Sequence, residues 1–350
     1  MSQALVSLER AALVREAGRS SGGVGPSAVL YEVDPVAGFV IGLAVGRSVV
    51  RAAIADLTGE PVARREERAR ARTATTLIRQ LGALARRVAD EAGVRRRQVT
   101  FVCVASPGVL DPGQDHLRMA HNPPGWERAG VLEALEAELG GHVVVENDVN
   151  LATIGEQRMG LGKEVSNFVY LHIGTGVGMG LVLNGELYRG SSGAAGEVGY
   201  VPIAVRDPRE RSSRRRGALE SALGANAILE LARRRGVAAA DARAVFEAAR
   251  AGDASARRVI GVVAERVALA IAAIAPVVDP ELVILGGGIG RQGDLLLEPV
   301  ERELAELSPF RPRIEVSALG EDAELHGAVA LALQSAQDLL FERNRRAPSG

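Results

Sequence analysis

The sequence predicts a two-lobed α/β protein, and two observations carry this prediction. Strands and helices alternate along the chain, which is the layer order of an α/β fold. This order occurs twice, and each half begins with a strand, a glycine-containing turn and a second strand, at residues 39–46 and 49–55 and again at residues 167–173 and 181–183. The length of 350 residues also favours about two domains.

Charge and cysteine content exclude several function classes. The formal net charge is −1, so no global excess of charge points to nucleic acid or to an anionic membrane. The single cysteine, Cys103, lies in an apolar run, which excludes a disulfide framework and a cysteine-rich zinc cluster. The apolar stretch 267–278 is shorter than a bilayer span, and no signal peptide is recognisable at the start. We therefore expect a cytoplasmic protein with no membrane partner.

The first 35 residues have a pattern of their own. Residues 2–17 carry apolar positions at helical spacing before the chain turns extended, and a Gly/Ser/Pro loop, 18–27, precedes a strand at 28–33. A short helix followed by a two-stranded ribbon is typical of the second half of a winged helix, in which Arg15 and Arg19 would lie near DNA phosphates. An ordinary helix and hairpin at a terminus explains the pattern at least as well.

The first lobe is expected over residues 36–146. The expected elements, in chain order, are strands at 39–46 and 49–55, a helix at 73–93, a strand at 98–105, rigid loops at 106–108 and 122–126, a helix at 129–139 and a strand at 142–145.

The last of these strands runs directly into Glu146, Asn147 and Asp148, which open a helical pattern. Ligands bind at such strand ends in open α/β sheets, and a helix N-terminus keeps an aspartate ionised. Asp148 is therefore a candidate hydrogen-bond acceptor for an alcohol. The alternative is that Asn147 or Asp148 only caps the helix.

The second lobe is expected over residues 147–350. After the strand at 167–173 comes a glycine-rich turn, Gly174 to Gly180, and a strand at 281–285 ends in Gly286, Gly287 and Gly288. Glycine turns let backbone N–H groups approach a phosphate, although glycine also serves plain hairpins. Helices are expected at 219–235, 241–251, 253–275 and 325–340, the last of which we expect to pack back on the first lobe.

At these motifs the chain resembles the ROK family, whose name joins repressors, open reading frames and sugar kinases. The resemblance runs from about residue 25 to residue 340, and it implies the actin-like ATPase fold, which is hexokinase-like and ribonuclease H-like. The motifs that carry it are Ser106-Pro107-Gly108, Asn122 to Trp126, Glu146 to Asn150 with Gly155-Glu156, Gly174 to Gly180, Gly193 to Gly199 and Gly286 to Gly288.

The resemblance also implies roles for single residues. In the kinases the residue that matches Asp148 is the general base that activates a sugar hydroxyl. The implied sugar-binding residues are Gly108, Asn122, Asn147, Asp148, Glu197 and Glu220. The implied nucleotide-binding residues, which form a degenerate site in this chain, are Gly46, Ser48, Gly174, Thr175, Gly176, Gly178, Gly286, Gly287 and Gly288.

Two departures from the family pattern bear on activity. The kinases resemble Asp-x-Gly-Gly-Thr-Lys at the first turn, whereas this chain has Ala44 in place of the aspartate and Arg47 in place of a glycine. Phosphoryl transfer depends on positioning and charge neutralisation, so such losses should be severe.

The zinc module also departs from the family. Its ligand positions hold Tyr200, Arg211, Ser213 and Ala218, so no zinc and no other metal is expected. The basic run 206–216 is interpreted as a solvated loop rather than a nucleic-acid contact.

Three hypotheses follow. The first is a non-catalytic, sugar-responsive regulator of the repressor branch: a sugar binds between the lobes, and domain closure moves an N-terminal DNA-contacting piece that is truncated or whose start codon is misassigned. DNA binding would require a complete winged helix. The second is an ATP-dependent, glucokinase-like sugar kinase that uses Asp148 and Mg·ATP. The third is a degenerate protein kept as an oligomeric partner. Relatives are commonly homodimers or homotetramers, and the sequence does not identify the sugar.

Overall fold

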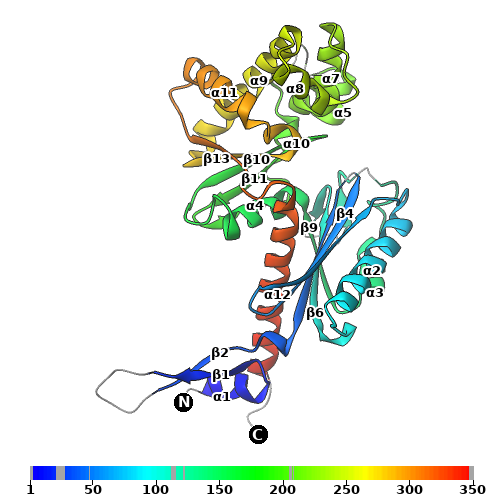
Figure 1. Cartoon of the computed structure of the whole chain (residues 1–350), viewed down its shortest axis with the longest axis vertical. Helices are drawn as coiled ribbons and strands as arrows, with labels where there is room; N and C mark the ends of the chain where they lie inside the picture. The colour runs from blue at the N-terminus through cyan, green and yellow to red at the C-terminus, as the bar shows by residue number, and fades with distance from the viewer. Residues whose placement is uncertain are drawn as a thin grey trace. The chain divides into compact units, whose positions relative to one another are not determined.

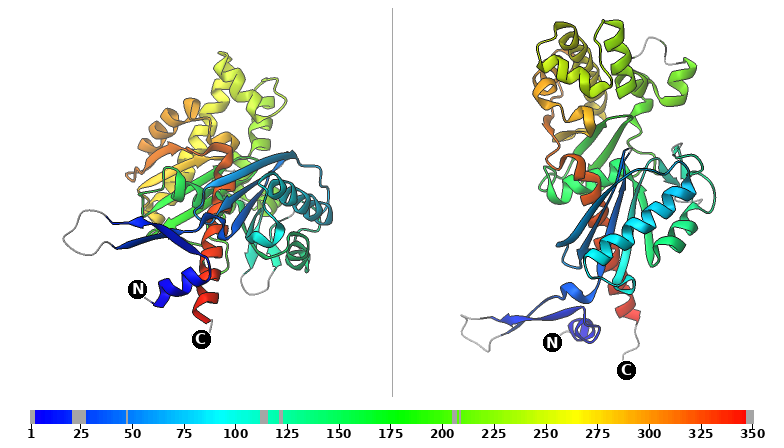
Figure 2. Two further views of the ribbon diagram at one scale, coloured as in Figure 1. Left: turned by 60° about the horizontal axis from the view of Figure 1, so that its bottom comes forward. Right: turned by 45° about the vertical axis from the view of Figure 1, so that its right-hand side comes forward.

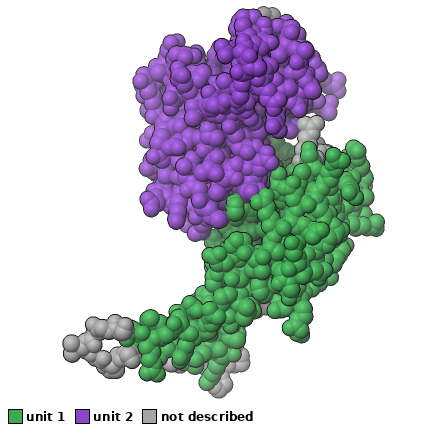
Figure 3. All heavy atoms as spheres, viewed as in Figure 1, with its two compact units in different colours: residues 1–151, 325–350 green, residues 152–324 purple. Residues whose placement is uncertain are grey.

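The computed structural model describes residues 3–20, 28–46, 48–111, 116–120, 123–204, 207 and 209–346. The chain forms two compact units, which Figure 3 shows in different colours. Unit 1 is Met1–Leu151 with Leu325–Gly350, and unit 2 is Ala152–Glu324. The division falls a few residues after the expected boundary at 146, and most of the last helix belongs to unit 1.

The N-terminal segment is a helix and an antiparallel hairpin (Figure 1). Helix α1, Gln3–Arg10, ends before Ala12, which takes a left-handed backbone conformation (φ 54°), and the extended stretch expected from Val14 comes next. Strands β1, Val14–Arg19, and β2, Val29–Val33, follow. The tip of the predicted wing, 21–27, lies outside the described residues. None of residues 5–20 and 28–37 is buried, so this segment has no core of its own.

Unit 1 is built on a five-stranded sheet with the order β5-β4-β3-β6-β9. Its strands are β3 Phe39–Val45, β4 Val49–Asp56, β5 Pro61–Arg68, β6 Val99–Ser106 and β9 His142–Asn147. Its other elements are α2 Ala74–Glu91, α3 Val131–Leu139, the small hairpin β7 Val109–Asp111 and β8 His116–Arg118, the 3-10 turns η1 Pro35–Ala37 and η2 Arg96–Gln98, and most of α12 Ala323–Arg346.

Helices cover both faces of this sheet, as Figures 1 and 2 show. Ile41 and Leu43 pack with α2 and α3 in one apolar core. The residue between them, Gly42, faces α12, where a Cβ atom would lie 2.8 Å from the backbone nitrogen of Val329. Because successive residues of a strand point to opposite faces, this alternation lets α12 approach the strand closely.

Unit 2 is built on a second five-stranded sheet, with the order β12-β11-β10-β13-β14. Its strands are β10 Phe168–Ile173, β11 Val177–Leu183, β12 Glu186–Leu187, β13 Leu282–Gly286 and β14 Arg313–Val316. Its helices are most of α4 Asp148–Met159, with α5 Arg211–Arg216, α6 Ala218–Leu223, α7 Ala225–Arg234, α8 Ala242–Arg250, α9 Ala254–Val278, α10 Gly287–Gly290 and α11 Gly293–Leu307, and its 3-10 turns are η3 Val198–Tyr200 and η4 Gly320–Asp322.

The core of unit 2 lies between this sheet and α9. Val169, Leu171 and Ile173 of β10 share one apolar cluster with α9, α8 and α11. Within the described part of the chain, α9 is the one helix long and apolar enough to cross a membrane, but 56% of that apolar window is buried inside the protein. Its apolar composition therefore serves the protein core.

Three predictions for unit 2 need correction. The helix predicted at 219–235 is two helices, because the chain turns at Gly224, where a Cβ atom would lie 3.0 Å from the carbonyl oxygen of Thr175. The basic run interpreted as a loop contains helix α5, whose Ser213 is buried. Helix α11 and strand β14 were not predicted.

Candidate functional site

The acid-amide cluster lies where two parallel strands end. Strands β6 and β9 pair in parallel with Ser106 opposite Asn147, so the turn after β6 and the start of α4 are neighbours at the same sheet edge. Ligands bind at this edge in open α/β sheets. The structure therefore brings Gly108 together with Asn147 in unit 1.

Asn147 caps helix α4 and ties it to the neighbouring turn. Its Oδ1 accepts hydrogen bonds from the backbone N–H groups of Val149 (3.0 Å) and Asn150 (3.1 Å). Its Nδ2 donates to the carbonyl oxygen of Gly108 at 2.8 Å. The capping interpretation is therefore right for Asn147, whose amide keeps one N–H for a ligand.

Asp148 is the first residue of the helix, and its Oδ1 accepts from the N–H of Val149 at 2.9 Å. Burial raises the pKa of this carboxyl to about 6, although hydrogen bonds from the backbone N–H groups of Val149 and of Asp148 itself oppose the rise. The expectation that the helix N-terminus keeps the acid ionised was therefore incomplete, because the cost of burying the charge outweighs the stabilisation by these backbone hydrogen bonds. Near neutral pH the carboxylate still predominates, and a pKa of this size suits a general base or a strong acceptor.

The turn at Gly108 has a conformation that favours glycine. Its φ is 87°, and a Cβ atom would lie 2.5 Å from the carbonyl oxygen of Arg118. Trp126, which is fully buried, donates from Nε1 to the Oγ of Ser106 at 2.7 Å. The loop that ends at Trp126 thus braces the turn. Asn122, the other predicted sugar contact in this loop, lies outside the described residues.

The first glycine turn, also in unit 1, is a tight hairpin between β3 and β4. The N–H of Gly46 donates to the carbonyl oxygen of Val49 at 2.9 Å, and the carbonyl of Ser48 accepts from Ala69 at 2.8 Å. Ala44, where the kinases carry aspartate, is buried within β3. Its methyl group cannot bind a cation, and Arg47 lies outside the described residues.

Unit 2 holds a polar cavity of about 640 Å³. Two glycine elements border it: Gly174 and Thr175 after β10, and Gly288 in α10. A Cβ atom at Gly288 would meet nothing within 4 Å, so the backbone there is open to a ligand. The structure therefore brings these three predicted nucleotide-binding residues to one cavity.

Three other predicted phosphate-binding glycines lie within or directly after strands. Gly178 lies in β11 opposite His172, so the turn predicted to extend to residue 180 ends at Gly176. A Cβ atom at Gly286 would lie 2.0 Å from the Tyr170 hydroxyl, and one at Gly287 would lie 2.4 Å from the carbonyl oxygen of Ile173. These glycines are needed because other groups approach them closely.

Charged side chains that were not predicted also line this cavity. Arg250 forms a bidentate ion pair with Asp294, with a distance of 2.6 Å to each carboxylate oxygen. Arg291 pairs with Glu321 at 2.8 Å. Burial and the nearby Arg291 lower the pKa of His172 to about 4, so the imidazole is neutral at pH 7. Nothing in the sequence marked these residues, because they come from separate helices and loops.

Glu197 and Glu220 both lie close enough to Tyr200 for their charges to act on it. Burial, then the charges of Glu197 and Glu220, raise the pKa of the Tyr200 phenol. The Glu220 carboxylate accepts from the N–H of Val177 at 3.2 Å, and burial raises its pKa against the effects of that bond and of Arg216. Glu220 thereby ties α6 to the end of the glycine turn.

The positions that hold zinc in relatives carry unsuitable donors here. Tyr200, Arg211, Ser213 and Ala218 offer neither imidazole nor thiolate, which structural zinc requires. Among the described residues, no group of three or more His, Cys, Asp or Glu side chains is placed to hold a metal ion. The residues present therefore do not fit a structural zinc.

The two predicted DNA-contacting arginines lie on strand β1. Arg15 pairs across the hairpin with Glu32 at 2.8 Å, and both side chains are about half exposed. Arg19 lies opposite Val29 at the last described pair of the hairpin, and it is exposed. The guanidinium of Arg15 is thus partly neutralised by its own hairpin.

Comparison with known proteins gives matches over most of the chain. A family model described as ROK family matches residues 40–335. A glucokinase of Thermotoga maritima is 32% identical over 252 residues, a match that covers 67% of this chain and 79% of that protein. The xylose repressor of Caldicellulosiruptor bescii is 26% identical over 336 residues, covering 90% of this chain and 83% of that protein.

A solved structure extends the similarity to nearly the whole chain. A ROK family transcriptional regulator, a homolog of the E. coli MLC protein, superposes with a TM-score of 0.80 at 21% sequence identity. The superposition covers 97% of this chain and 89% of that one. These matches confirm the resemblance and the actin-like, hexokinase-like fold expected from the sequence.

Proposed function

The chain belongs to the ROK family, and from this premise we propose that it is a sugar-responsive transcriptional regulator that binds its effector without efficient phosphorylation. Relatives of both kinds, glucokinases and xylose repressors, match the chain. The observation that favours a regulator is Ala44, an apolar residue at the position where the kinases carry a carboxylate.

In this proposal Asp148 receives a sugar hydroxyl. Its carboxylate follows β9, it is mostly ionised at neutral pH, and the Asn147 cap and the Gly108 turn hold the helix start in place. On binding, the alcohol exchanges a hydrogen bond with water for one with a carboxylate. This exchange is favourable when the carboxylate is already desolvated.

Match lengths give further support for the regulator branch. The repressor match covers 90% of the chain, whereas two glucokinase matches cover 67% and 84%. In the proposal the hairpin with Arg15 and Arg19 contacts DNA only if a complete winged helix is present, and the protein is a cytoplasmic homodimer or homotetramer without zinc.

The test is a thermal-shift screen of the purified chain against a panel of hexoses, pentoses, N-acetylated hexosamines and their phosphates. A ligand that binds only the folded state raises the melting temperature by mass action. One sugar should give a saturable rise that the Asp148→Ala variant loses, with no further rise on adding Mg·ATP. If no sugar in the panel changes the melting temperature, the proposal fails.

A sugar kinase is the second candidate, favoured by the raised pKa of Asp148 and by the retained cavity at Gly174, Thr175 and Gly288. A base with a pKa of about 6 is suited to accept a hydroxyl proton near neutral pH. This candidate predicts a large rise in melting temperature with Mg·ATP that increases when sugar is present. It also predicts turnover that Asp148→Asn abolishes.

A further inference from the structure

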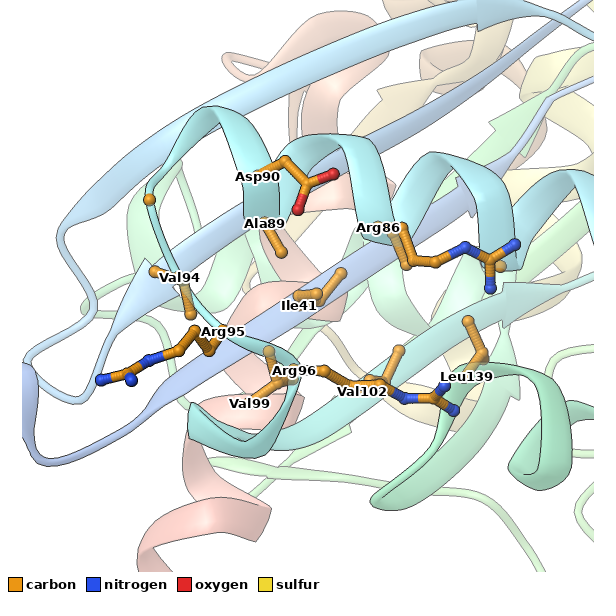
Figure 4. A pocket seen from close by; sticks show the side chains of 13 residues that line it. Ile41, Arg86, Ala89, Asp90, Val94, Arg95, Arg96, Val99, Val102 and Leu139 are labelled. Atoms are coloured by element: carbon orange, nitrogen blue, oxygen red, sulfur yellow. The ribbon is translucent and has the colours of Figure 1, made fainter.

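A second cavity lies in unit 1, on the side of the sheet that α2 covers. Its volume is about 470 Å³, within the range of pockets that hold small molecules. Apolar side chains of β3, β6, α2 and α3 form its floor and walls, among them Ile41, Val102 and Leu139. Figure 4 shows these side chains with the charged residues around them.

The rim of this cavity carries more positive than negative charge. Arg86, Arg95 and Arg96 line it together with one carboxylate, Asp90. In Figure 4, Arg86 from α2 and Arg96 from η2 extend toward the Leu139 end, while Arg95 points the other way. Both guanidinium groups therefore lie toward the same end of the apolar cavity.

Both of these groups already contact one residue. Arg86 donates to the Glu138 carboxylate at 2.8 Å, and Arg96 donates to the Glu138 backbone carbonyl at 3.2 Å. The Arg86 and Glu138 side chains are 51% and 27% exposed, and an ion pair of this kind contributes little net stability. A guanidinium has five N–H donors, so an incoming anion can add to these contacts or replace the Glu138 carboxylate.

The cavity is separate from the strand-end site. Its lining includes Val99, the first residue of β6, whereas Ser106, beside Asn147, is the last. These two residues are roughly 20 Å apart along an extended strand. The cavity thus lies toward the opposite end of the strands, where Val99 pairs with Phe39 and the N-terminal segment enters β3.

From this arrangement we infer that unit 1 binds a small amphipathic anion: an apolar ring or branched chain inserted over Val102 and Leu139, with one carboxylate or phosphate held by Arg86 and Arg96. The apolar walls favour an apolar body, since its burial removes area from water. A guanidinium group favours a planar, two-oxygen anion, which it can bind in a bidentate manner.

The test is isothermal titration calorimetry of the full chain with 2-naphthoate, alongside its neutral analogue 2-naphthamide and the small anion acetate. The expected result is saturable binding of 2-naphthoate and at least tenfold weaker binding of both other probes. Equal binding of 2-naphthoate and 2-naphthamide, or no saturable binding of 2-naphthoate, would overturn the inference.

Matched variants locate the binding. Arg86→Gln and Arg96→Gln should each weaken the binding of 2-naphthoate roughly tenfold, because each removes a charge-assisted hydrogen bond. Glu138→Gln frees Arg86 and should tighten binding by up to about fivefold. Arg79→Gln, a substitution of an exposed residue on α2 outside the cavity lining, should leave binding unchanged.

If Arg86→Gln, Arg96→Gln and Glu138→Gln all leave the affinity for 2-naphthoate unchanged, the probe binds elsewhere and the inference is refuted. None of these variants touches Asp148, so the sugar assay remains an independent readout.

Discussion

At the residue scale, burial shifts the pKa values of two side chains, Asp148 and His172, in opposite directions. Burial raises the pKa of the Asp148 carboxyl to about 6 and lowers that of the His172 imidazole to about 4. In both cases desolvation disfavours the charged form, which is the anion for aspartate and the cation for histidine. Each shift therefore makes a different prediction for stability against pH.

For Asp148 the folded state binds the proton more tightly than the unfolded state does. The buried carboxylate therefore destabilises the folded state. This effect is absent below the pKa of the unfolded chain, near 4, and complete above about pH 6. Asp148→Asn should therefore raise the free energy of unfolding at pH 7.5 by up to about 3 kcal/mol, and by about half as much at pH 5. Urea unfolding at the two pH values measures this. An equal gain at both would show that the carboxyl has an ordinary pKa.

For His172 the unfolded state binds the proton more tightly. Stability is unaffected above the unfolded pKa near 6.5 and falls as the pH drops toward 4. His172→Gln should remove this loss, which amounts to roughly 2–3 kcal/mol between pH 7 and pH 4. Unfolding curves of the two proteins across that range give the answer. Parallel pH profiles would contradict the assignment.

At the element scale, close contact between a helix and a strand depends on glycine, which has no side chain. A Cβ atom at Gly180 in β11 would lie 1.8 Å from the Oγ1 of Thr153 in α4. Gly180→Ala should therefore destabilise the protein by roughly 1–3 kcal/mol, and the penalty should shrink in a Thr153→Ala background, as a double-mutant cycle would show.

The matched control for this cycle is Gly261 in α9, where a Cβ atom would meet nothing within 4 Å. Gly261→Ala should stabilise the protein by about 0.5–1 kcal/mol, because alanine has the higher helix propensity. A similar cost at both glycines would mean that loss of backbone freedom, and not the contact with Thr153, causes the effect at Gly180.

The N-terminal helix and hairpin should open more easily than the two lobes. None of residues 5–20 and 28–37 is buried, whereas β3 and β10 are almost entirely buried. Amide hydrogens of β1 and β2 should therefore exchange by local opening, well before those of β3. Hydrogen exchange followed by mass spectrometry measures this. Protection of β1 equal to that of β3 would show that the segment is part of a cooperative core.

The elements most accurately predicted were those whose pattern is local. The strand at β3 and the helix at α2 each carry an uninterrupted apolar period, and their ends shifted by only one or two residues. Helix α11 and strand β14 were missed; no comparable pattern marked them. The close packing around Gly286 and Gly287 was also beyond the sequence, because it depends on which atoms from other segments approach the backbone.

The candidate site was predictable to a similar extent. Asp148 and Asn147 could be identified because strand, cap and helix follow one another in the chain. The raised pKa of Asp148 could not, since desolvation depends on the whole surrounding structure. The same holds for Arg250, Arg291 and His172, which reach one cavity from three separate elements.

At the scale of the whole molecule, the family match leaves two activities possible and one residue favours the regulator. In the proposed function Asp148 accepts a sugar hydroxyl, and unit 2 holds a polar cavity, but Ala44 stands where the kinases carry a carboxylate. Because phosphoryl transfer depends on charge neutralisation, sugar binding should survive this replacement while catalysis does not.

The most direct test of this account is release of ADP by the purified chain at saturating Mg·ATP, with the sugar that raises its melting temperature. The account predicts no ADP above the protein-free blank over many hours, with the sugar-dependent thermal shift intact in the same buffer. Sugar-dependent ADP formation over many turnovers, abolished by Asp148→Asn, would contradict it and identify the chain as a kinase.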